Sequence, residues 1–230
     1  MAYNSTMRVE IVSDVICPWC FIGKRRFEQA LALHPLPDLT IEWRPFELNP
    51  DMPRQGMARA DYVAAKFGSA ERGQAVYDRV AEAGRESGIA FAFDRMTRIP
   101  NTLDAHRLIR LAGRARRQDA VVEGLFSAYF LEGRDIGDPK VLTEIGRAAG
   151  IEPGAIAHAL ADDTDVEAIK SEISLAQQMG VSGVPFFIFD GVYGISGAQP
   201  PETFVEVFKA IELETARAEA EGLPASQDAF

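Results

Sequence analysis

Cys17-Pro18-Trp19-Cys20 contains the only two cysteines in the 230 residues of the chain. Upstream, residues 7–13 alternate β-branched apolar residues with polar ones, which predicts a strand. Downstream, residues 21–33 carry apolar side chains at helical intervals. The pair is therefore expected where a strand passes into a helix, and its two-residue spacing is typical of a redox-active dithiol.

The two cysteines are expected to have different roles. The thiolate is the nucleophile in disulfide exchange, and the free N–H groups and positive dipole end of a helix N-terminus favour that form of Cys17. Pro18 suits the first helical turn, where its missing N–H costs nothing. Cys20, one turn further on, is placed to attack a mixed disulfide formed on Cys17 and to release the partner. We expect Pro18 and Trp19 to tune the redox potential and the surrounding surface.

The pair also has other interpretations. A structural zinc site needs about four ligands, but the chain has no second cysteine pair, and His34, His106 and His158 lie far apart in sequence. We therefore predict no metal. A structural disulfide across so short a loop would restrain little of the chain. Two unrelated cysteines at this spacing remain an alternative on local sequence alone.

The composition limits the class of protein. With 47% hydrophobic residues, the chain can bury the core of one large domain or of one domain with an insertion. A net charge of -10 argues against binding nucleic acid or an anionic membrane surface. The first residues lack the basic start and apolar run of a secretory signal, and no apolar stretch is long enough to span a bilayer. We expect a cytoplasmic protein, in which a lone cysteine pair is catalytic or redox-sensing.

Beyond the first helix, residues 39–46 predict a second strand, and the turn-rich residues 49–57 predict a loop. Residues 58–180 are almost entirely helical in pattern, with breaks at 86–101 and 133–138. Three helix starts carry capping signals: Asn101 or Thr102 for a helix through residue 117, Asp138 followed by Pro139, and Asp165 for a helix through residue 179. Within this block, buried packing explains the aromatic cluster of Phe126, Tyr129 and Phe130 better than a substrate groove does.

Strand character returns at residues 186–190 and 192–195, and an amphipathic helix begins at Pro201. Val184-Pro185 lies just before the first of these strands, where proline cannot be an ordinary central residue. A cis bond there would expose the backbone of Val184 to an extended peptide or thiol substrate. On local sequence alone, a trans proline that opens the strand is favoured.

In three motifs the chain resembles the DsbA-type branch of the thioredoxin superfamily, and in detail its cytoplasmic FrnE-like members. The motifs are Ser13-Asp14-Val15-Ile16-Cys17-Pro18-Trp19-Cys20-Phe21-Ile22-Gly23-Lys24, Pro100-Asn101-Thr102-Leu103-Asp104-Ala105-His106-Arg107 and Gly180-Val181-Ser182-Gly183-Val184-Pro185-Phe186-Phe187.

The resemblance implies an α/β thioredoxin fold with a large inserted all-helical domain. The βαβ part would span residues 1–57, the helical insertion 58–180, the ββα part 181–222 and a mobile tail 223–230. It also implies a catalytic dithiol and a cis proline at Pro185, with Val184 and Pro185 binding the substrate.

The same branch contains 2-hydroxychromene-2-carboxylate isomerases and kappa-class glutathione transferases, which typically have a serine in place of the cysteine pair. They also tend to carry an acidic residue that helps to hold glutathione where this chain reads Ser196-Gly197-Ala198-Gln199. Both departures favour dithiol chemistry, although Ser196 and Gln199 could still hydrogen-bond to a glutathione moiety.

Three further residues are candidates. Asp14 could accept a proton from the resolving thiol or be a solvated or capping residue. Asn101 is a candidate within its own motif, and His106 in the same motif could shuttle protons or have a structural polar role.

The sequence thus predicts a thiol–disulfide oxidoreductase acting on a protein or small-molecule thiol or disulfide. We expect no bound cofactor, with glutathione as a candidate co-substrate. A glutathione-dependent isomerase or transferase and a non-enzymatic redox sensor are the alternatives. The sequence determines neither the physiological substrate nor the oligomeric state.

Overall fold

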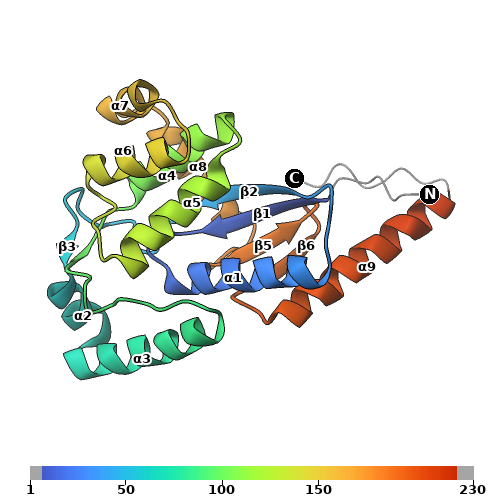
Figure 1. The fold of residues 1–230 in the computed structure, drawn as a ribbon, viewed down its shortest axis with the longest axis horizontal. Helices are drawn as coiled ribbons and strands as arrows, with labels where there is room; N and C mark the ends of the chain where they lie inside the picture. Colours follow the sequence, from blue (N-terminus) through green and yellow to red (C-terminus); the bar gives the residue numbers. More distant parts are fainter. Residues whose placement is uncertain (1–6, 222–230) are drawn as a thin grey trace.

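The computed structural model describes residues 7–221 and places a four-stranded sheet between layers of helices (Figure 1). The strand order is β2-β1-β5-β6. The first two strands are parallel, whereas β5 is antiparallel to β1 and to β6. The elements of this part are β1 (Arg8–Ser13), α1 (Pro18–Leu33), β2 (Thr40–Pro45), β5 (Phe186–Phe189), β6 (Tyr193–Ser196) and α9 (Pro201–Ala220). This arrangement of βαβ and ββα units is the α/β fold that the resemblance implies.

Helices α1 and α9 cover one face of the sheet and bury an aromatic core there (Figure 1). Phe27 of α1 lies at the centre of this core, and its ring is within 6.3 Å of four other phenylalanine rings. Those rings belong to Phe187, Phe189, Phe204 and Phe208. Burial of these large apolar surfaces therefore fixes α1 against β5, which begins directly after Val184-Pro185.

A smaller apolar cluster covers the opposite face. Ala176 of α8 (Val166–Gln178) packs there with Val12 of β1, Phe46, Val181 and Ile188. Val12 faces this cluster, whereas Val9 and Ile11 belong to the core beneath α1. This alternation is the period of two that a strand imposes.

Eight helical segments and two short strands lie between β2 and β5 in the chain. They are β3 (Met57–Ala58), α2 (Arg59–Phe67), α3 (Ala70–Glu86), β4 (Arg98–Ile99), α4 (Leu103–Arg114), α5 (Gln118–Phe126), the π-helical turn η1 (Ser127–Leu131), α6 (Pro139–Ala148) and α7 (Pro153–Ala161), followed by α8. Phe126, Tyr129 and Phe130 are buried, as expected for packing. Phe21, directly after Cys20, stacks on Phe126 with ring centroids 5.0 Å apart, so this cluster holds α1 against α5.

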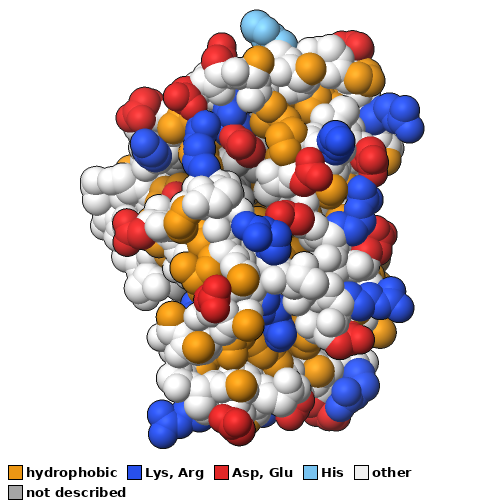
Figure 2. All heavy atoms as spheres, turned by 90° about the vertical axis from the view of Figure 1, so that its left-hand side faces the viewer, with side chains coloured by type: hydrophobic (Ala, Val, Ile, Leu, Met, Phe, Trp, Pro, Cys, Tyr) orange, Lys and Arg blue, Asp and Glu red, His pale blue; other side chains and the backbone are white. Residues whose placement is uncertain are grey.

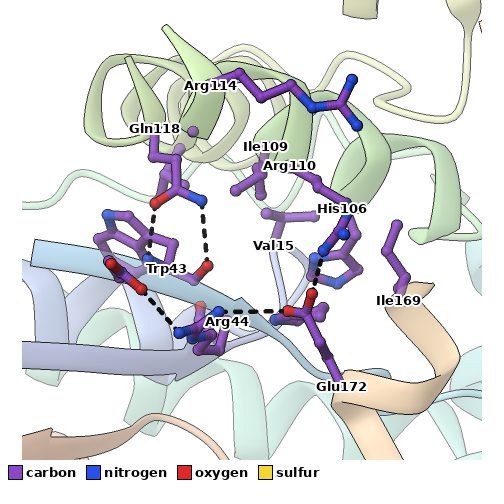
Figure 3. A pocket seen from close by; sticks show the side chains of 15 residues that line it. Val15, Trp43, Arg44, His106, Ile109, Arg110, Arg114, Gln118, Ile169 and Glu172 are labelled. Carbon is purple, nitrogen blue, oxygen red and sulfur yellow. Dashed lines mark hydrogen bonds and ion pairs between the residues drawn. The ribbon is translucent and has the colours of Figure 1, made fainter. Parts of the chain in front are cut away.

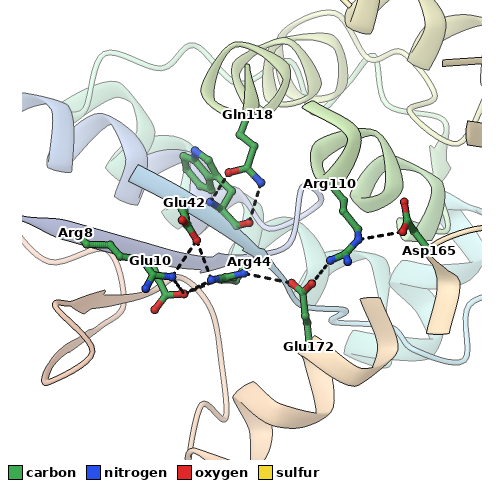
Figure 4. Close-up of polar contacts among 9 residues, drawn as sticks. Arg8, Glu10, Glu42, Arg44, Arg110, Gln118, Asp165 and Glu172 are labelled. Carbon is green, nitrogen blue, oxygen red and sulfur yellow. Dashed lines mark hydrogen bonds and ion pairs between the residues drawn. The ribbon is translucent and has the colours of Figure 1, made fainter. Parts of the chain in front are cut away.

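Polar contacts attach the helices to the edge of the sheet. The side-chain amide of Gln118 accepts a hydrogen bond from the backbone N–H of Trp43 and donates one to its carbonyl (Figures 3 and 4). A chain of ion pairs runs from Arg44 of β2 through Glu172 of α8 to Arg110 of α4 (Figure 4). Both contacts fix β2 relative to the helices.

The structure corrects several details of the sequence-based prediction. The helix expected through residue 117 ends at Arg114, because Arg116 adopts φ 54° and breaks it. The carboxylate of Asp165 does not cap α8, since it pairs with Arg110 and Arg114. Strands β3 and β4, two residues each, were not predicted. The boundaries at 57/58 and 180/181 stay predictions, and the expected mobile tail, 223–230, lies outside the described residues.

Within residues 7–221, no helix combines the length and the apolar composition that a membrane span needs.

We predict that Gly23→Ala destabilises the protein. Its added methyl would lie 2.9 Å from Cγ of Pro185, and such overpacking costs roughly 1–3 kcal/mol. Alanine is by itself about 1 kcal/mol better than glycine inside a helix, so a net loss can only come from this contact. Urea unfolding of the reduced protein measures the free energy.

Gly183→Ala, in the loop that carries Pro185, is the control, because its added Cβ meets no heavy atom within 4 Å. It should change the free energy of unfolding by less than about 0.5 kcal/mol. A Gly23→Ala protein as stable as the native one would show that α1 does not pack tightly on Pro185.

Candidate active site

The cysteine motif is held in a tight connection between β1 and α1. The backbone N–H of Cys17 donates to the carbonyl of Asp14 at 2.9 Å, and Cys17 is the N-cap residue of α1. Pro18 occupies the first helical position, and the N–H of Cys20 returns to the carbonyl of Cys17 at 3.0 Å. Both cysteines are buried free thiols, whereas Trp19 between them is 40% exposed. The strand-to-helix position predicted for the motif is confirmed.

The structure brings Val184-Pro185 to this motif across 167 residues of chain. The thiol of Cys17 lies 3.6 Å from the carbonyl oxygen of Val184, as a weak hydrogen-bond donor. The bond between Val184 and Pro185 is cis, as the resemblance implies. The Pro185 carbonyl accepts a hydrogen bond from the N–H of Gly197 at 2.8 Å, which links the loop to the end of β6.

Cys20 lies deeper than Cys17, with 1% of its surface exposed. Burial raises the pKa of the Cys20 thiol well above its ordinary value of 9.0, and the neighbouring Cys17 side chain raises it further. The Ser13 hydroxyl and the backbone N–H of Asp14 act in the opposite direction and lower this pKa. The resolving thiol is therefore protonated at neutral pH and must lose its proton before it can attack.

The Asp14 side chain is completely buried, and its carboxylate is occupied by backbone groups. It accepts hydrogen bonds from the N–H of Leu48 at 2.8 Å and from that of Ile16 at 3.4 Å. Nε2 of His106 lies 2.9 Å from the Phe46 carbonyl and 3.6 Å from Oδ1 of Asp14. His106 thus has a structural polar contact in this structure. The solvated or capping aspartate expected at Asp14 is wrong, because Asp14 is buried and Cys17 is the N-cap residue of α1.

Asn101 also joins segments of backbone. Its side-chain nitrogen donates to the Met52 carbonyl at 2.7 Å, and its oxygen accepts from the N–H of Leu103 at 3.0 Å. Asn101 thus anchors the loop after β2 to the start of α4. Ser196 and Gln199 are exposed, and the Gln199 amide donates to the Ser196 carbonyl at 2.8 Å.

Two polar groups near the motif were missed in the sequence. Ser13 ends β1 and is buried, and its hydroxyl has no hydrogen-bond partner among the described residues. Period-two alternation from Val9 and Ile11 would have placed this polar residue on the core face. Glu47 follows β2, and burial raises the pKa of its carboxyl, while nearby His106 counteracts the shift. No sequence pattern singled out Glu47.

A cavity of about 390 Å³ lies between the edge of β2 and helices α4 and α8 (Figure 3). Its lining includes the ion-paired Arg44, Arg110 and Glu172, with Val15 and His106 on the side of the cysteine motif. The paired charges offer little net attraction to an ion. Among the described residues, no group of three or more His, Cys, Asp or Glu side chains is arranged to hold a metal.

The N-terminal end of α1, where the motif lies, points toward the left of Figure 1, which is the side that Figure 2 faces. Figure 2 shows basic and acidic side chains interspersed among apolar patches on this face. This side of the protein therefore presents no continuous surface of one charge to a substrate.

A comparison of the chain with known protein families agrees with the geometry of this site. The DSBA-like thioredoxin domain family matches residues 8–209. The chain belongs to this family. In its fold, the cysteine pair at the start of α1 and the loop before β5 form one site, although 167 residues separate Cys17 from Val184.

The chain is similar to several individual proteins. It is 26% identical over 200 residues to the uncharacterized protein YwbO of Bacillus subtilis (strain 168), with 86% of this chain and 94% of that protein aligned. The crystal structure of a probable DsbA oxidoreductase from Streptomyces coelicolor has a TM-score of 0.79 at 33% identity and covers 97% of this chain and 94% of its own.

Two more distant structures share the fold. A 2-hydroxychromene-2-carboxylate isomerase has a TM-score of 0.64 at 15% identity and covers 94% of this chain and 100% of its own. The cytosolic disulfide reductase DsbM of Pseudomonas aeruginosa has a TM-score of 0.62 at 17% identity, covers 89% of this chain and 99% of its own, and has also been solved with GSH.

The raised pKa of Cys20 predicts how stability depends on pH. Above pH 9.0 the unfolded chain loses this proton while the folded chain keeps it, so the reduced protein loses stability as pH rises toward the folded pKa. The loss is at most about 1.4 kcal/mol per pH unit. We expect urea unfolding to show a steeper decline for the native reduced protein than for Cys20→Ala.

The comparison of slopes removes contributions from groups common to both proteins, such as Tyr129, whose pKa is also raised by burial. Parallel pH profiles for the native protein and Cys20→Ala would contradict a protonated, buried Cys20.

Proposed function

We propose that the protein is a thiol–disulfide oxidoreductase that reacts through the Cys17–Cys20 pair. The observation that carries the proposal is the position of Cys17 at the N-cap of α1, with its sulfur 3.6 Å from the Val184 carbonyl. Reactive cysteines commonly occupy helix N-termini. The Val184 backbone lies where it can pair with the chain of a substrate whose sulfur bonds to Cys17.

The proposed reaction has two steps. The thiolate of Cys17 attacks one sulfur of a substrate disulfide, and the other substrate sulfur leaves and takes up a proton. The Cys20 thiol then loses its proton and attacks Cys17, so that the substrate sulfur leaves with the electron pair and the enzyme disulfide forms. The substrate is reduced by two electrons and the cysteine pair is oxidised, and the reverse sequence oxidises a substrate dithiol.

The proposed setting is the cytoplasm, with glutathione as a co-substrate that returns the pair to its starting redox state. Two likenesses support this setting: the fold shared with DsbM, described as a cytosolic disulfide reductase and solved with GSH, and the FrnE-like motifs. The substrate itself can be a protein or a small disulfide, because both meet the chemical requirement of a sulfur accessible to Cys17.

A glutathione-dependent isomerase or transferase is the second candidate, favoured by the shared fold of the 2-hydroxychromene-2-carboxylate isomerase. In that reaction the thiol comes from bound glutathione, so Cys20 would be dispensable. Against it, Gln199 already bonds to the Ser196 carbonyl, and this stretch offers no acidic side chain to glutathione.

We predict that Cys17→Ser and Cys20→Ser each lower turnover in a glutathione-coupled insulin-reduction assay by about two orders of magnitude or more, because each removes a required sulfur. The two variants should differ with oxidised glutathione. Cys20→Ser should accumulate a mixed disulfide on Cys17, visible by mass spectrometry, whereas Cys17→Ser should not.

Circular dichroism of both variants verifies that the fold is kept. Turnover that survives in Cys20→Ser, together with tight binding of glutathione, would replace the proposal by the isomerase or transferase. A native protein that cycles its cysteines without catalytic turnover would be a redox sensor.

A further inference from the structure

The mechanism proposed above gives no role to the buried hydroxyl of Ser13. Ser13 is 4% exposed, and its Oγ has no hydrogen-bond partner within the part of the chain that the structure describes. A hydroxyl left unpaired in a protein interior is unfavourable, so the residue calls for an explanation.

The position of Ser13 gives that explanation. Ser13 lies on the same face of β1 as Val9 and Ile11, which pack in the core beneath α1 together with Cys20. The carbonyl of Ser13 is fixed by the N–H of Phe46 at 3.0 Å, and the turn that follows is closed by the Cys17 N–H on Asp14. This places Ser13 one turn of backbone before the start of α1, and its side chain is one of the groups that lower the pKa of the Cys20 thiol.

We propose that Ser13 is a positioning residue for the resolving step, whose hydroxyl donates a hydrogen bond to the Cys20 thiolate as it forms. This inference rests on the proposed dithiol function and adds the group that stabilises the negative charge on the buried sulfur. A charged acceptor makes a far stronger hydrogen bond than a neutral thiol, so the bond forms mainly when Cys20 ionises.

The Cys20 thiol releases its proton to solvent, and its thiolate forms the bond to Sγ of Cys17 while the bond between Cys17 and the substrate sulfur breaks. The substrate sulfur leaves with the electron pair and takes up a proton. Ser13 keeps its own proton throughout and is neither oxidised nor reduced.

The first test measures the ionisation of Cys20 in a Cys17→Ser background, where Cys20 is the only cysteine. Ultraviolet absorbance of the thiolate against pH should show that Ser13→Ala raises the Cys20 pKa by about one unit, a tenfold change in ionisation. The neighbouring segments carry further titratable groups that interact with one another: Asp14 in the turn before α1, Glu47 after β2, His106 of α4 and Tyr129 of η1. They are present in both proteins of the comparison.

The second test measures the resolving step. Oxidised glutathione loads Cys17, and rapid quenching with mass spectrometry follows the release of glutathione by Cys20. In an otherwise native chain, Ser13→Ala should slow this release about tenfold at neutral pH, while formation of the mixed disulfide keeps its rate. Ser13→Thr retains the hydroxyl and should restore most of the rate.

Ser87→Ala is the matched control, because Ser87 is also buried but its Oγ already accepts a hydrogen bond from Nε of Arg26 at 3.1 Å. It should lower the Tm and leave the Cys20 pKa unchanged. Ser13→Ala should show the opposite signature, with an unchanged or higher Tm in the reduced protein, because it removes an unpaired donor.

An unchanged Cys20 pKa and release rate in Ser13→Ala would overturn the inference. A loss of Tm in Ser13→Ala without a pKa shift would also overturn it and assign Ser13 a purely structural role. If Ser13→Thr does not fold, the comparison of the native protein with Ser13→Ala still tests the hydrogen bond from Ser13 to Cys20. The titration needs no turnover, so a failure of the proposed function is distinguished from a failure of this hydrogen bond.

Discussion

The carboxylate of Asp14 accepts hydrogen bonds from the backbone N–H groups of Ile16 and Leu48 although its side chain has no contact with solvent. Through these bonds one side chain joins the turn that carries the cysteines to the segment that follows β2. The Asp14 carbonyl adds a third bond, from the N–H of Cys17. Because a buried carboxylate is stable only when its oxygens are satisfied, this set of bonds holds as a unit. The positions of Cys17, Cys20 and the first turn of α1 depend on it.

The second half of the site is assembled by apolar packing. Phe27 of α1 lies among phenylalanines of β5 and α9, and the close approach of Gly23 to Pro185 sets how near the helix comes to the loop before β5. The Cys17 sulfur thereby reaches the Val184 carbonyl. The site thus combines a polar framework beneath Cys17 with an aromatic core that delivers its partner from the far end of the chain. The helices between β2 and β5 contribute a third contact, in which Phe21 stacks on Phe126.

Much of this could be predicted from the sequence because the relevant signals are local. The alternation in β1, the apolar stripe of α1 and the cap at Asp138 each depend on residues within a few positions of one another, and the structure agrees with them. The approach of Val184 to Cys17 came only from the family resemblance, since local pattern favoured a trans proline. Asp165 followed the capping rule in sequence, but two arginines of α4 engage its carboxylate. Ser13 and Glu47 escaped notice because their surroundings are created by tertiary contacts.

The hydrogen bonds between Gln118 and Trp43 have a consequence for behaviour at high concentration. The outer strand of an open sheet exposes N–H and C=O groups that another extended chain can join, and such joining leads to aggregation. Gln118 occupies one such pair of groups on β2, and Pro45 ends the strand without an N–H to offer. These two features hinder the addition of another strand at the β2 edge of the sheet. Contact with unfolded polypeptides is therefore less able to nucleate intermolecular β-structure at this edge.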